Sequence, residues 1–493
     1  MKHFPAFVTF VFFLSSGVIA SDEPERLFAP DNERSFAMAL ATSGDVMAVG
    51  STARADEAFG GVYLYTRNES ESGDADWSYV LLTASDGDAT DRFGEAVAMD
   101  GGLLAVGAPM ASVEGLPEAG AVYLFRREAG EHWKEFARLG AADPTVMAMF
   151  GSSIDVDDGR VIVGAPQADV ELGMPGGAAY VFDCSVVCTQ SAKLSPSTHV
   201  AGSRFGSSVA ISGGFAAVGR TGEEIVYVYE HDGESWRHAQ SLDPAFIEPA
   251  FDEGTGIGGS VLLDGNVLAI GAPHDDDPSA GSEPGWFTGV VHVYEHNGDD
   301  WVRTAVLSGK GIAEPVARFG LRIDLEDGNL AVTAGREISA RVYRRDAAGA
   351  WSLAADFFID EQLDPIPVAV SRERLLVGYP NARLGSVDEP PLVEVYALAG
   401  PAGEAPPEHD EDDAADQDTG GTGDTADSDA GNSDGGGNGN PDDGADGAGD
   451  NETAGTSGTE TRRDNGGGAG TWLLVLLLAA AIPGRAGKRR SRS

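Results

Sequence analysis

The sequence is poor in cysteine, in positive charge and in long apolar segments. It has 2 cysteines in 493 residues, and no second cysteine or histidine pair accompanies them, which argues against a structural zinc site. Lys and Arg number 33 against 79 Asp and Glu, so the formal net charge is −46. A nucleic-acid-binding surface needs a basic footprint, and this balance argues against one. The apolar stretches Phe7–Leu14 and Trp472–Ile482 are both shorter than the ~20 residues of a typical membrane-spanning helix.

The sequence also lacks the common catalytic motifs. It contains no Gly-x-Ser-x-Gly elbow, no His-Glu-x-x-His and no phosphate-binding loop before a helix. The Gly-rich segment 254–259 is similar to a dinucleotide fingerprint, but it opens a strand pattern and no helix follows it. The nine histidines are scattered, and only His274 lies beside a carboxylate cluster. We therefore assign no catalytic residues and expect no enzyme.

What the sequence does contain is an internal repeat. A Phe-Gly pair is followed by an apolar run, a tight turn and a second run that ends in Gly-Ala-Pro. The interval between the two ends is the same in the copies that start at Phe93, Phe150 and Ile257, whose Gly-Ala-Pro begins at Gly107, Gly164 and Gly271. Seven starts can be placed, at Phe36, Phe93, Phe150, Phe205, Ile257, Phe319 and Asp364. A fixed period of this kind indicates a repeat architecture.

Each copy predicts four antiparallel strands. In the second copy these are a strand at Val97 and Met99, an Asp-Gly turn, a strand at 103–106, a third at Val122 and Leu124, and a fourth that begins near Trp133. One such sheet cannot bury both of its faces, whereas seven around an axis can. The seventh copy ends near Tyr396 without a fourth strand. The segment around Leu27 supplies it, so the sequence predicts an all-β, seven-bladed β-propeller closed by its N-terminal strand.

These copies resemble FG-GAP repeats, as in the integrin α-subunit propeller and many bacterial surface proteins. The resemblance covers residues 21–400 and implies an integrin-α-like propeller. The aromatic of each Phe-Gly pair, such as Phe150, is expected to wedge between blades together with the aromatic of strand three, such as Phe182. The Gly and Ser that follow each Phe are expected to permit close approach of the inner strands at the axis.

The chain ends predict export. Residues 1–20 have Lys2, an apolar stretch and a small-residue exit at Ala20, which is typical of a signal peptide cleaved before Ser21. The alternative is an uncleaved anchor. Residues 401–469 are rich in Gly, Asp, Ala, Thr and Ser with almost no large apolar residue, which predicts a disordered acidic linker.

The C-terminal tail, residues 470–493, combines a short apolar helix with a basic end. Together with the preceding Gly466–Gly468 it resembles the GlyGly-CTERM sorting tails of Gram-negative bacteria. That resemblance implies cleavage by a rhomboid-type protease and placement at the cell surface or release. The alternative is a single-span membrane anchor with its basic cluster on the cytoplasmic side.

Cys184 and Cys188 fall where other copies place the turn between strands three and four. In an exported protein this spacing predicts a disulfide that closes the hairpin.

The strand order fixes which loops share a side. Loops after strands two and four lie on one face and are longer and richer in Asp, so we expect binding on that face. Two acidic clusters there are candidates for Ca²⁺, which prefers several oxygen ligands: Asp86, Asp88 and Asp91 in one, and Asp275, Asp276 and Asp277 in the other. The alternative for both is a solvated polar loop.

The integrin-type calcium loop lies between strands one and two, and the third copy departs from it. Asp155-Val156-Asp157-Asp158-Gly159 starts similarly, but Ile162 replaces the final Asp and the hairpin is too tight. The family's metal sites are therefore not carried over to this chain.

Three functions are compatible with this sequence. The first is an exported, monomeric cell-surface protein that recognises an extracellular protein or polysaccharide, with or without calcium. The second is a propeller hydrolase or lyase acting on glycans or phosphoesters, which needs His274 and two carboxylates to meet in one pocket. The third is a passive surface-layer or biofilm component. The acidic charge suits a cationic or metal-bridged partner, or solubility alone.

Overall fold

The computed structural model describes residues 24–30, 35–52, 59–69, 75–129, 132–171, 173–196, 198–244, 255–275, 288–309, 318–334, 339–358, 367–380 and 391–398. The chain divides into two compact units, Met1–Asp410 and Glu411–Ser493. The predictions for the signal peptide, the acidic linker, the C-terminal tail, Asp276, Asp277 and the seventh start at Asp364 lie outside the described residues.

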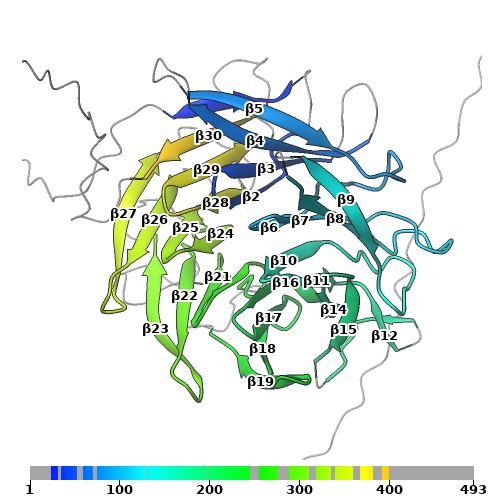
Figure 1. Cartoon of the computed structure of the whole chain (residues 1–493). Coiled ribbons are helices and arrows are strands. Elements are labelled where there is room, and N and C mark those ends of the chain that lie inside the picture. The colour runs from blue at the N-terminus through cyan, green and yellow to red at the C-terminus, as the bar shows by residue number, and fades with distance from the viewer. Residues whose placement is uncertain are drawn as a thin grey trace, which may run out of the picture. The chain divides into compact units, whose positions relative to one another are not determined.

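The first unit contains seven four-stranded antiparallel sheets (Figure 1). We number these blades along the chain. Blade 1 is β2 (Ala39–Ser43), β3 (Val46–Ser51), β4 (Gly61–Glu69) and β5 (Ala75–Leu82). Blade 2 is β6 (Val97–Asp100), β7 (Leu103–Ala108), β8 (Ala121–Arg127) and β9 (Trp133–Leu139). Blade 3 is β10 (Ser153–Asp157), β11 (Arg160–Ala165), β14 (Ala178–Asp183) and β15 (Thr189–Leu194).

Blades 4 to 6 repeat this order. Blade 4 is β16 (Phe205–Ser212), β17 (Phe215–Arg220), β18 (Ile225–His231) and β19 (Trp236–Leu242). Blade 5 is β20 (Val261–Asp264), β21 (Val267–Ala272), β22 (Val290–His296) and β23 (Trp301–Ser308). Blade 6 is β24 (Ile323–Glu326), β25 (Asn329–Thr333), β26 (Ser339–Arg345) and β27 (Trp351–Phe358). A short ribbon in blade 3, β12 (Asp169–Glu171) with β13 (Met174–Pro175), was not predicted.

Blade 7 is completed by the N-terminal strand, as the sequence predicts. It contains β28 (Val368–Val370), β29 (Arg374–Tyr379) and β30 (Leu392–Ala397), with β1 (Glu25–Phe28) antiparallel to β30. Leu27 lies opposite Val393, and Glu25 lies opposite Val395, next to Tyr396. The first and last strands of the described propeller are thus hydrogen-bonded to each other.

The first strands of the blades contact one another in a closed cycle. The order is β2, β6, β10, β16, β20, β24 and β28, and β28 contacts β2 again. This cycle shows a seven-bladed β-propeller around a common centre (Figure 1).

The hydrophobic core lies between neighbouring blades. Phe150 is fully buried with side chains of blade 2, such as Leu124, and of blade 3, such as Tyr180. Its ring is edge-on to Tyr180 at 5.5 Å and to Phe182 at 6.0 Å between centroids. Phe93 and Phe205 make equivalent contacts in blades 2 and 4. The predicted wedge between blades is confirmed.

The Phe-Gly pair forms a tight turn. The N–H of Glu95 donates to the carbonyl of Arg92 at 3.2 Å, and Gly94 at the third turn position has a φ of 92°. This conformation favours glycine. Each Gly of Gly-Ala-Pro is also approached by the next Phe-Gly: a Cβ on Gly107 would lie 2.2 Å from the carbonyl oxygen of Gly151. The close approach is therefore between neighbouring blades, where only glycine fits.

Candidate functional site

The two faces of the propeller differ as the strand order predicts. One face, the hairpin face, carries the short turns after the first and third strands, such as 101–102 between β6 and β7. The other, the loop face, carries the longer loops after the second and fourth strands, such as 109–120 and 140–152. Both acidic clusters predicted from the sequence belong to loops of the loop face.

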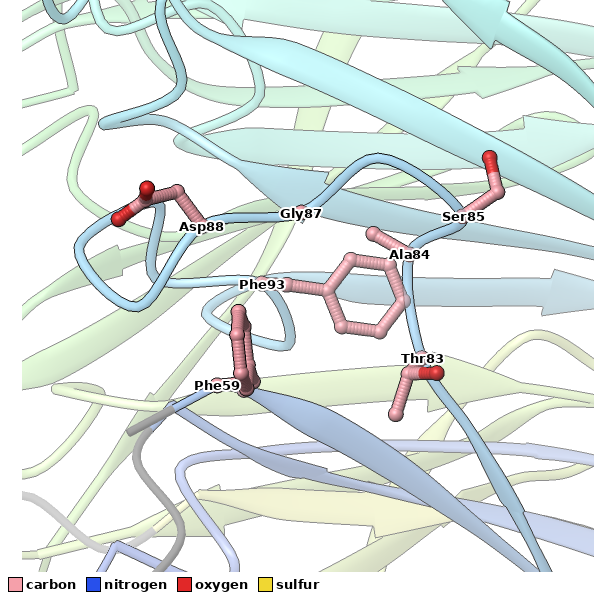
Figure 2. A pocket seen from close by; sticks show the side chains of 8 residues that line it. Phe59, Thr83, Ala84, Ser85, Gly87, Asp88 and Phe93 are labelled. Atoms are coloured by element: carbon pink, nitrogen blue, oxygen red, sulfur yellow. The ribbon is translucent and has the colours of Figure 1, made fainter. Parts of the chain in front are cut away.

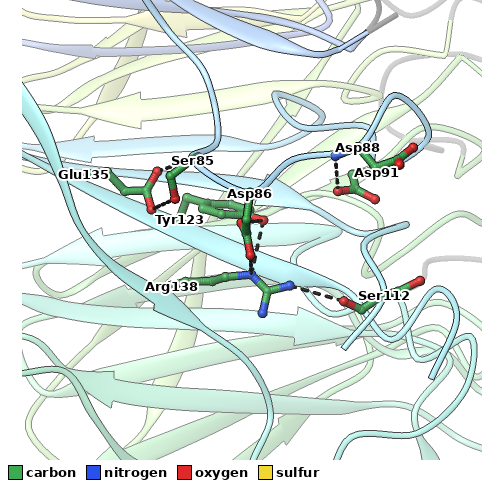
Figure 3. Close-up of polar contacts among 8 residues, drawn as sticks. All are labelled: Ser85, Asp86, Asp88, Asp91, Ser112, Tyr123, Glu135 and Arg138. Atoms are coloured by element: carbon green, nitrogen blue, oxygen red, sulfur yellow. Dashed lines mark hydrogen bonds and ion pairs between the residues drawn. The ribbon is translucent and has the colours of Figure 1, made fainter. Parts of the chain in front are cut away.

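The Asp86 carboxylate is bonded to two side chains of blade 2. Its carboxylate accepts a hydrogen bond from the Tyr123 hydroxyl at 2.7 Å and lies 3.5 Å from Nε of Arg138 (Figure 3). Arg138 also donates to the Tyr123 hydroxyl at 3.2 Å. Burial, together with the hydrogen bond to Asp86, raises the pKa of Tyr123 to about 12, although Arg138 opposes the shift. The three side chains connect the loop after β5 to strands β8 and β9.

Blade 3 repeats the same arrangement without an acidic cluster. Tyr180 donates to Asp143 at 3.1 Å, and Lys193 Nζ lies 2.6 Å from the other Asp143 oxygen. Asp143 lies in Ala-Ala-Asp-Pro, a context with no calcium-like pattern. The recurrence indicates that Asp86 and Asp143 hold the loop between blades to the sheet that follows.

Asp88 and Asp91 lie at the other end of the same loop (Figure 3). The Asp88 N–H donates to the buried Asp91 carboxylate at 2.8 Å, and the Thr90 N–H donates to Asp88 at 3.3 Å. Among the described residues, no three His, Cys, Asp or Glu side chains are arranged to hold a metal ion. A shared calcium site would require Asp86 to leave Tyr123 and Arg138, and calcium binding stays a prediction.

Of the second predicted cluster, the structure describes Asp275 alone. Asp275 is fully buried, and its carboxylate lies 3.3 Å from Nε2 of His292, which is also fully buried. Arg303 lies 3.3 Å from the other ring nitrogen of His292 and donates to the Pro244 carbonyl at 2.9 Å. Asp275 therefore anchors the loop after β21 inside blade 5. Its sequence neighbours Asp276 and Asp277 lie outside the described residues.

A small pocket of about 240 Å³ lies on the loop face between blades 1 and 2 (Figure 2). Phe59, Thr83, Ala84 and Phe93 line it, with Asp88 among the other lining residues. The Ser85 hydroxyl is bound to Glu135 at 2.7 Å. The pocket has room for a single side chain, and His274 is not among its lining residues.

A larger cavity of about 810 Å³ lies between the first strands of all seven blades, and we call it the central cavity. Its lining is acidic, which the sequence pattern does not predict. The lining carboxylates come from β6, β10, β20 and β24 and from residues close to these strands: Glu95, Asp100, Asp155, Asp157, Asp264, Asp324, Glu326 and Asp327. Arg322 also lines the cavity, where the surrounding protein lowers its pKa.

Most of these carboxylates hold neighbouring blades together. In blades 1 to 5, the side chain at the end of the first strand accepts the backbone N–H of the next blade's hairpin turn. Asp100 accepts from Asp158 at 2.9 Å, and Asp157 accepts from Gly213 at 3.0 Å. Ser43, Ser212 and Asp264 do the same for Gly101, Gly265 and Gly328, at 2.9, 3.1 and 3.3 Å. The Asp155–Asp158 segment that starts like a calcium loop thus has a structural role.

Three cavity carboxyls titrate far above their ordinary range. Burial raises the pKa of Asp155 to about 7, although the N–H groups of Ile211 and Val156 oppose the shift. Burial likewise raises the pKa of Asp324 to about 6. Burial and the nearby Asp324 raise the pKa of Glu326 to about 8. Burial thus stabilises the neutral form of each group relative to its charged form, compared with the unfolded chain.

The raised pKa values predict lower stability at alkaline pH. An acid whose folded pKa exceeds its unfolded value stabilises the protein fully below the unfolded pKa, and this contribution is lost as the pH rises through the folded pKa. The window here runs from about pH 4 to pH 8. The thermal midpoint of unfolding should therefore fall as the pH rises through this window.

Glu326→Gln, which keeps an acceptor for Thr42, should be more stable than the unmodified protein at pH 9 and equally stable at pH 5. Glu128→Gln, on an exposed turn, is the control; equal pH profiles of the Glu326 variant and the unmodified protein would refute this prediction.

The predicted disulfide between Cys184 and Cys188 is present. It closes the turn between β14 and β15, on the hairpin face. Cys184 is buried against the core between blades 2 and 3. None of the described residues forms a helix with the length and apolar character that a membrane crossing requires.

Comparison with known proteins supports the repeat. The family model described as "FG-GAP repeat" matches residues 79–125, 133–182 and 188–229. Each match runs from the fourth strand of one blade to the third strand of the next, so it crosses a blade boundary. None of the curated proteins matches the sequence. Among solved structures, the chain is similar to the WD40 domain of Toxoplasma gondii coronin, at 9% identity and a TM-score of 0.45, over 77% of this chain and 87% of that chain. The matched residues are thus similar to FG-GAP repeats, and they lie in the seven-bladed β-propeller described above.

Proposed function

We propose that this protein is an exported recognition protein, which binds an extracellular protein or polysaccharide through the loop face. The observation that carries the proposal is that the loops of this face are hydrogen-bonded to one another. The backbone N–H of Met147 donates to the Pro117 carbonyl at 3.0 Å, and the N–H of Gly202 donates to the Pro175 carbonyl at 2.6 Å. Loops held in one conformation lose less entropy on binding, which favours recognition.

The fold is consistent with such a role. FG-GAP repeats are typical of non-enzymatic binding domains, and the matched repeats cover the strands of blades 2 and 3, the last strand of blade 1 and the first three strands of blade 4. A propeller supplies a rigid disc, and its loops can vary without disturbing the sheets. We propose that the propeller acts as a monomer.

Export and surface attachment are part of the proposal. A disulfide forms and persists in oxidising compartments, and the Cys184–Cys188 bond supports a location outside the cytoplasm. The signal at residues 1–20 and the sorting tail at 470–493 would place a Gram-negative surface protein in the outer envelope or release it. Intact mass of the surface-exposed and secreted forms tests both ends. Retention of residues 1–20 in both forms would contradict export by signal cleavage.

The described residues give the enzyme alternative little support. That alternative needs His274 and two carboxylates in one pocket. Neither of the two cavities described above has His274 in its lining, and the carboxylate of Asp275 is turned to His292. We therefore propose a non-covalent role.

Binding to a panel of purified glycans and envelope proteins tests the function. We expect at least one specific partner, and its binding should be lost when loop-face residues are changed and retained when hairpin-face residues are changed. Absence of any partner would favour the passive structural alternative. The same panel with a calcium chelator, together with calorimetry of the propeller with Ca²⁺, tests the loops at Asp86 and Asp275. Absence of both heat and a thermal shift would remove calcium from the proposal.

A further inference from the structure

Four large apolar side chains are exposed on three neighbouring segments of the loop face. They are Val146 and Met147 in the loop 140–152, Met174 on β13, and Val200 in the loop 195–204, with exposed fractions of 47, 51, 41 and 43%. We call these four residues the apolar row. Monomeric soluble proteins rarely expose large contiguous apolar patches, and such patches mark interaction sites.

Hydrogen bonds hold the three segments together. The Asp169 N–H at the start of β12 donates to the Thr145 hydroxyl at 3.2 Å, and Gln167 N–H donates to the Ala148 carbonyl at 3.3 Å. These bonds connect the loop 140–152 to the start of β12 and to the residues just before it. The Gly202–Pro175 bond connects the ribbon to the loop 195–204. The row is therefore carried by one connected surface across blades 2 to 4.

Met147 is held in a conformation that large side chains rarely adopt. Its φ is 59°, in the left-handed region, and its N–H is bonded to Pro117. Two of the four side chains in the row are methionines, whose flexible thioether adapts to irregular partner surfaces. Methionine is enriched in protein–protein interfaces.

Uncompensated negative charge lies beside the row. Glu118 accepts a backbone hydrogen bond from Met149 at 3.1 Å, and Asp169 is bonded to Thr145, so both lie next to the loop of Met147. Glu114 lies in the same loop as Glu118. None of the ion pairs found among the described residues involves these three carboxylates. Arg204 and His199 lie at the other end, near Val200.

We propose that the apolar row docks a polypeptide segment that carries apolar side chains next to lysine or arginine. This inference rests on the proposed function and narrows its partner from protein or polysaccharide to protein. The four side chains of the row offer no hydrogen-bonding group except weak thioether acceptors. A polysaccharide placed on them would lose water from its hydroxyls without a replacement partner.

A second copy of the chain fits the row poorly. A symmetric dimer places the same patch of both copies face to face. Glu114, Glu118 and Asp169 of one copy would then meet acidic side chains of the other, and like charges across an interface are unfavourable. A basic partner instead gains from these carboxylates.

Model peptides test the chemistry without knowledge of the natural partner. We would measure binding to the full chain of a fluorescent peptide of leucine and lysine, a peptide of leucine and glutamate, and a peptide of serine and lysine. The leucine–lysine peptide should bind most tightly, and added salt should weaken it. The double variant Met147→Ser/Met174→Ser should weaken its binding by about tenfold, the loss expected of central interface anchors.

The hairpin face supplies a matched control. Val186 and Val187, at the disulfide-closed turn, are more exposed than any residue of the row, at 79 and 72%. The variant Val186→Ser/Val187→Ser should leave peptide binding unchanged. Glu118→Lys should weaken the leucine–lysine peptide and strengthen the leucine–glutamate peptide. All these side chains are on the surface, and thermal midpoints should stay unchanged.

Several outcomes would overturn the inference. One is that Val186→Ser/Val187→Ser weakens peptide binding as much as Met147→Ser/Met174→Ser does. Another is that the serine–lysine or the leucine–glutamate peptide binds as tightly as the leucine–lysine peptide. A third is that the chain self-associates and Met147→Ser/Met174→Ser abolishes this, which would assign the row to a second copy. A glycan from the panel whose binding requires Met147 and Met174 would also contradict it. A panel partner that binds the double variant normally would leave the proposed function standing and remove only this site. Absence of all panel partners would instead count against the function itself.

Discussion

Phe150→Ala should lower the free energy of unfolding by about 3–5 kcal/mol, the usual cost of removing a buried aromatic side chain. Phe150 is fully buried between blades 2 and 3, and its ring contacts Tyr180 and Phe182 edge-on. Truncation leaves a cavity whose walls come from two different sheets. Because the sheets are fixed in a closed ring, they cannot move together to fill it. Urea unfolding followed by tryptophan fluorescence measures the loss.

The control is Phe150→Leu, which keeps an apolar side chain of similar reach. Leucine leaves a smaller cavity than alanine, so Phe150→Leu should cost clearly less than Phe150→Ala. A loss below about 1 kcal/mol for Phe150→Ala would show that neighbouring blades do relax into the space, and it would contradict the wedge as a main source of stability.

The sequence predicts the propeller because each blade repeats the same local physics. Alternating apolar residues, an Asp-Gly turn and a Trp at the start of the fourth strand recur at a fixed period, and β6, β7, β8 and β9 follow them closely. The missing fourth strand of the last copy also points to closure by Leu27. Among the residues that the structure describes, the ribbon β12–β13 has no counterpart in the other blades, so the repeat pattern does not predict it.

The candidate site is harder to predict because its contacts join distant residues. The acidic neighbours of Asp86 make it a candidate calcium ligand or part of a solvated loop, and they give no sign of its structural partners Tyr123 and Arg138, which lie in later strands. One signal was available. Asp86 and Tyr123 are 37 positions apart, and so are Asp143 and Tyr180. The same contact therefore recurs at the same place in two consecutive copies.

The acidic lining of the central cavity has no local signature. Asp155 and Asp324 are far apart in the sequence, yet the charge of Asp324 contributes to raising the pKa of Asp155. Their proximity follows from ring closure alone, since first strands of all blades face one centre. In blades 2, 3, 5 and 6, the carboxylate at the end of the first strand looks like an ordinary turn residue in the sequence.

The second large effect is expected for substitutions in β1, the N-terminal strand that completes blade 7. Leu27→Ala should lower the free energy of unfolding by about 2–5 kcal/mol, as for other buried leucines. Leu27 is buried in a cluster that joins blade 7, through Leu376 and Val393, to blade 1, through Phe36 and Tyr63. Phe28→Ala is the matched control. Phe28 is the next residue of the same strand, and it points to the opposite face, where it is exposed. That control should cost less than about 0.5 kcal/mol, as surface substitutions usually do.

Deletion of residues 25–28 should cost more than Leu27→Ala. The deletion removes Arg26, whose Nε lies 3.0 Å from the buried carboxylate of Glu394. Glu394 then keeps only the hydroxyls of Tyr379 and Tyr396, both at 2.7 Å, as partners among the described residues. The deletion also leaves β30 as an open edge, which is prone to pairing with other chains. We expect a lower thermal midpoint together with concentration-dependent association in light scattering. A deletion variant that stays monomeric and as stable as Phe28→Ala would show that blade 7 does not need its N-terminal strand, because three strands would then suffice to close the ring.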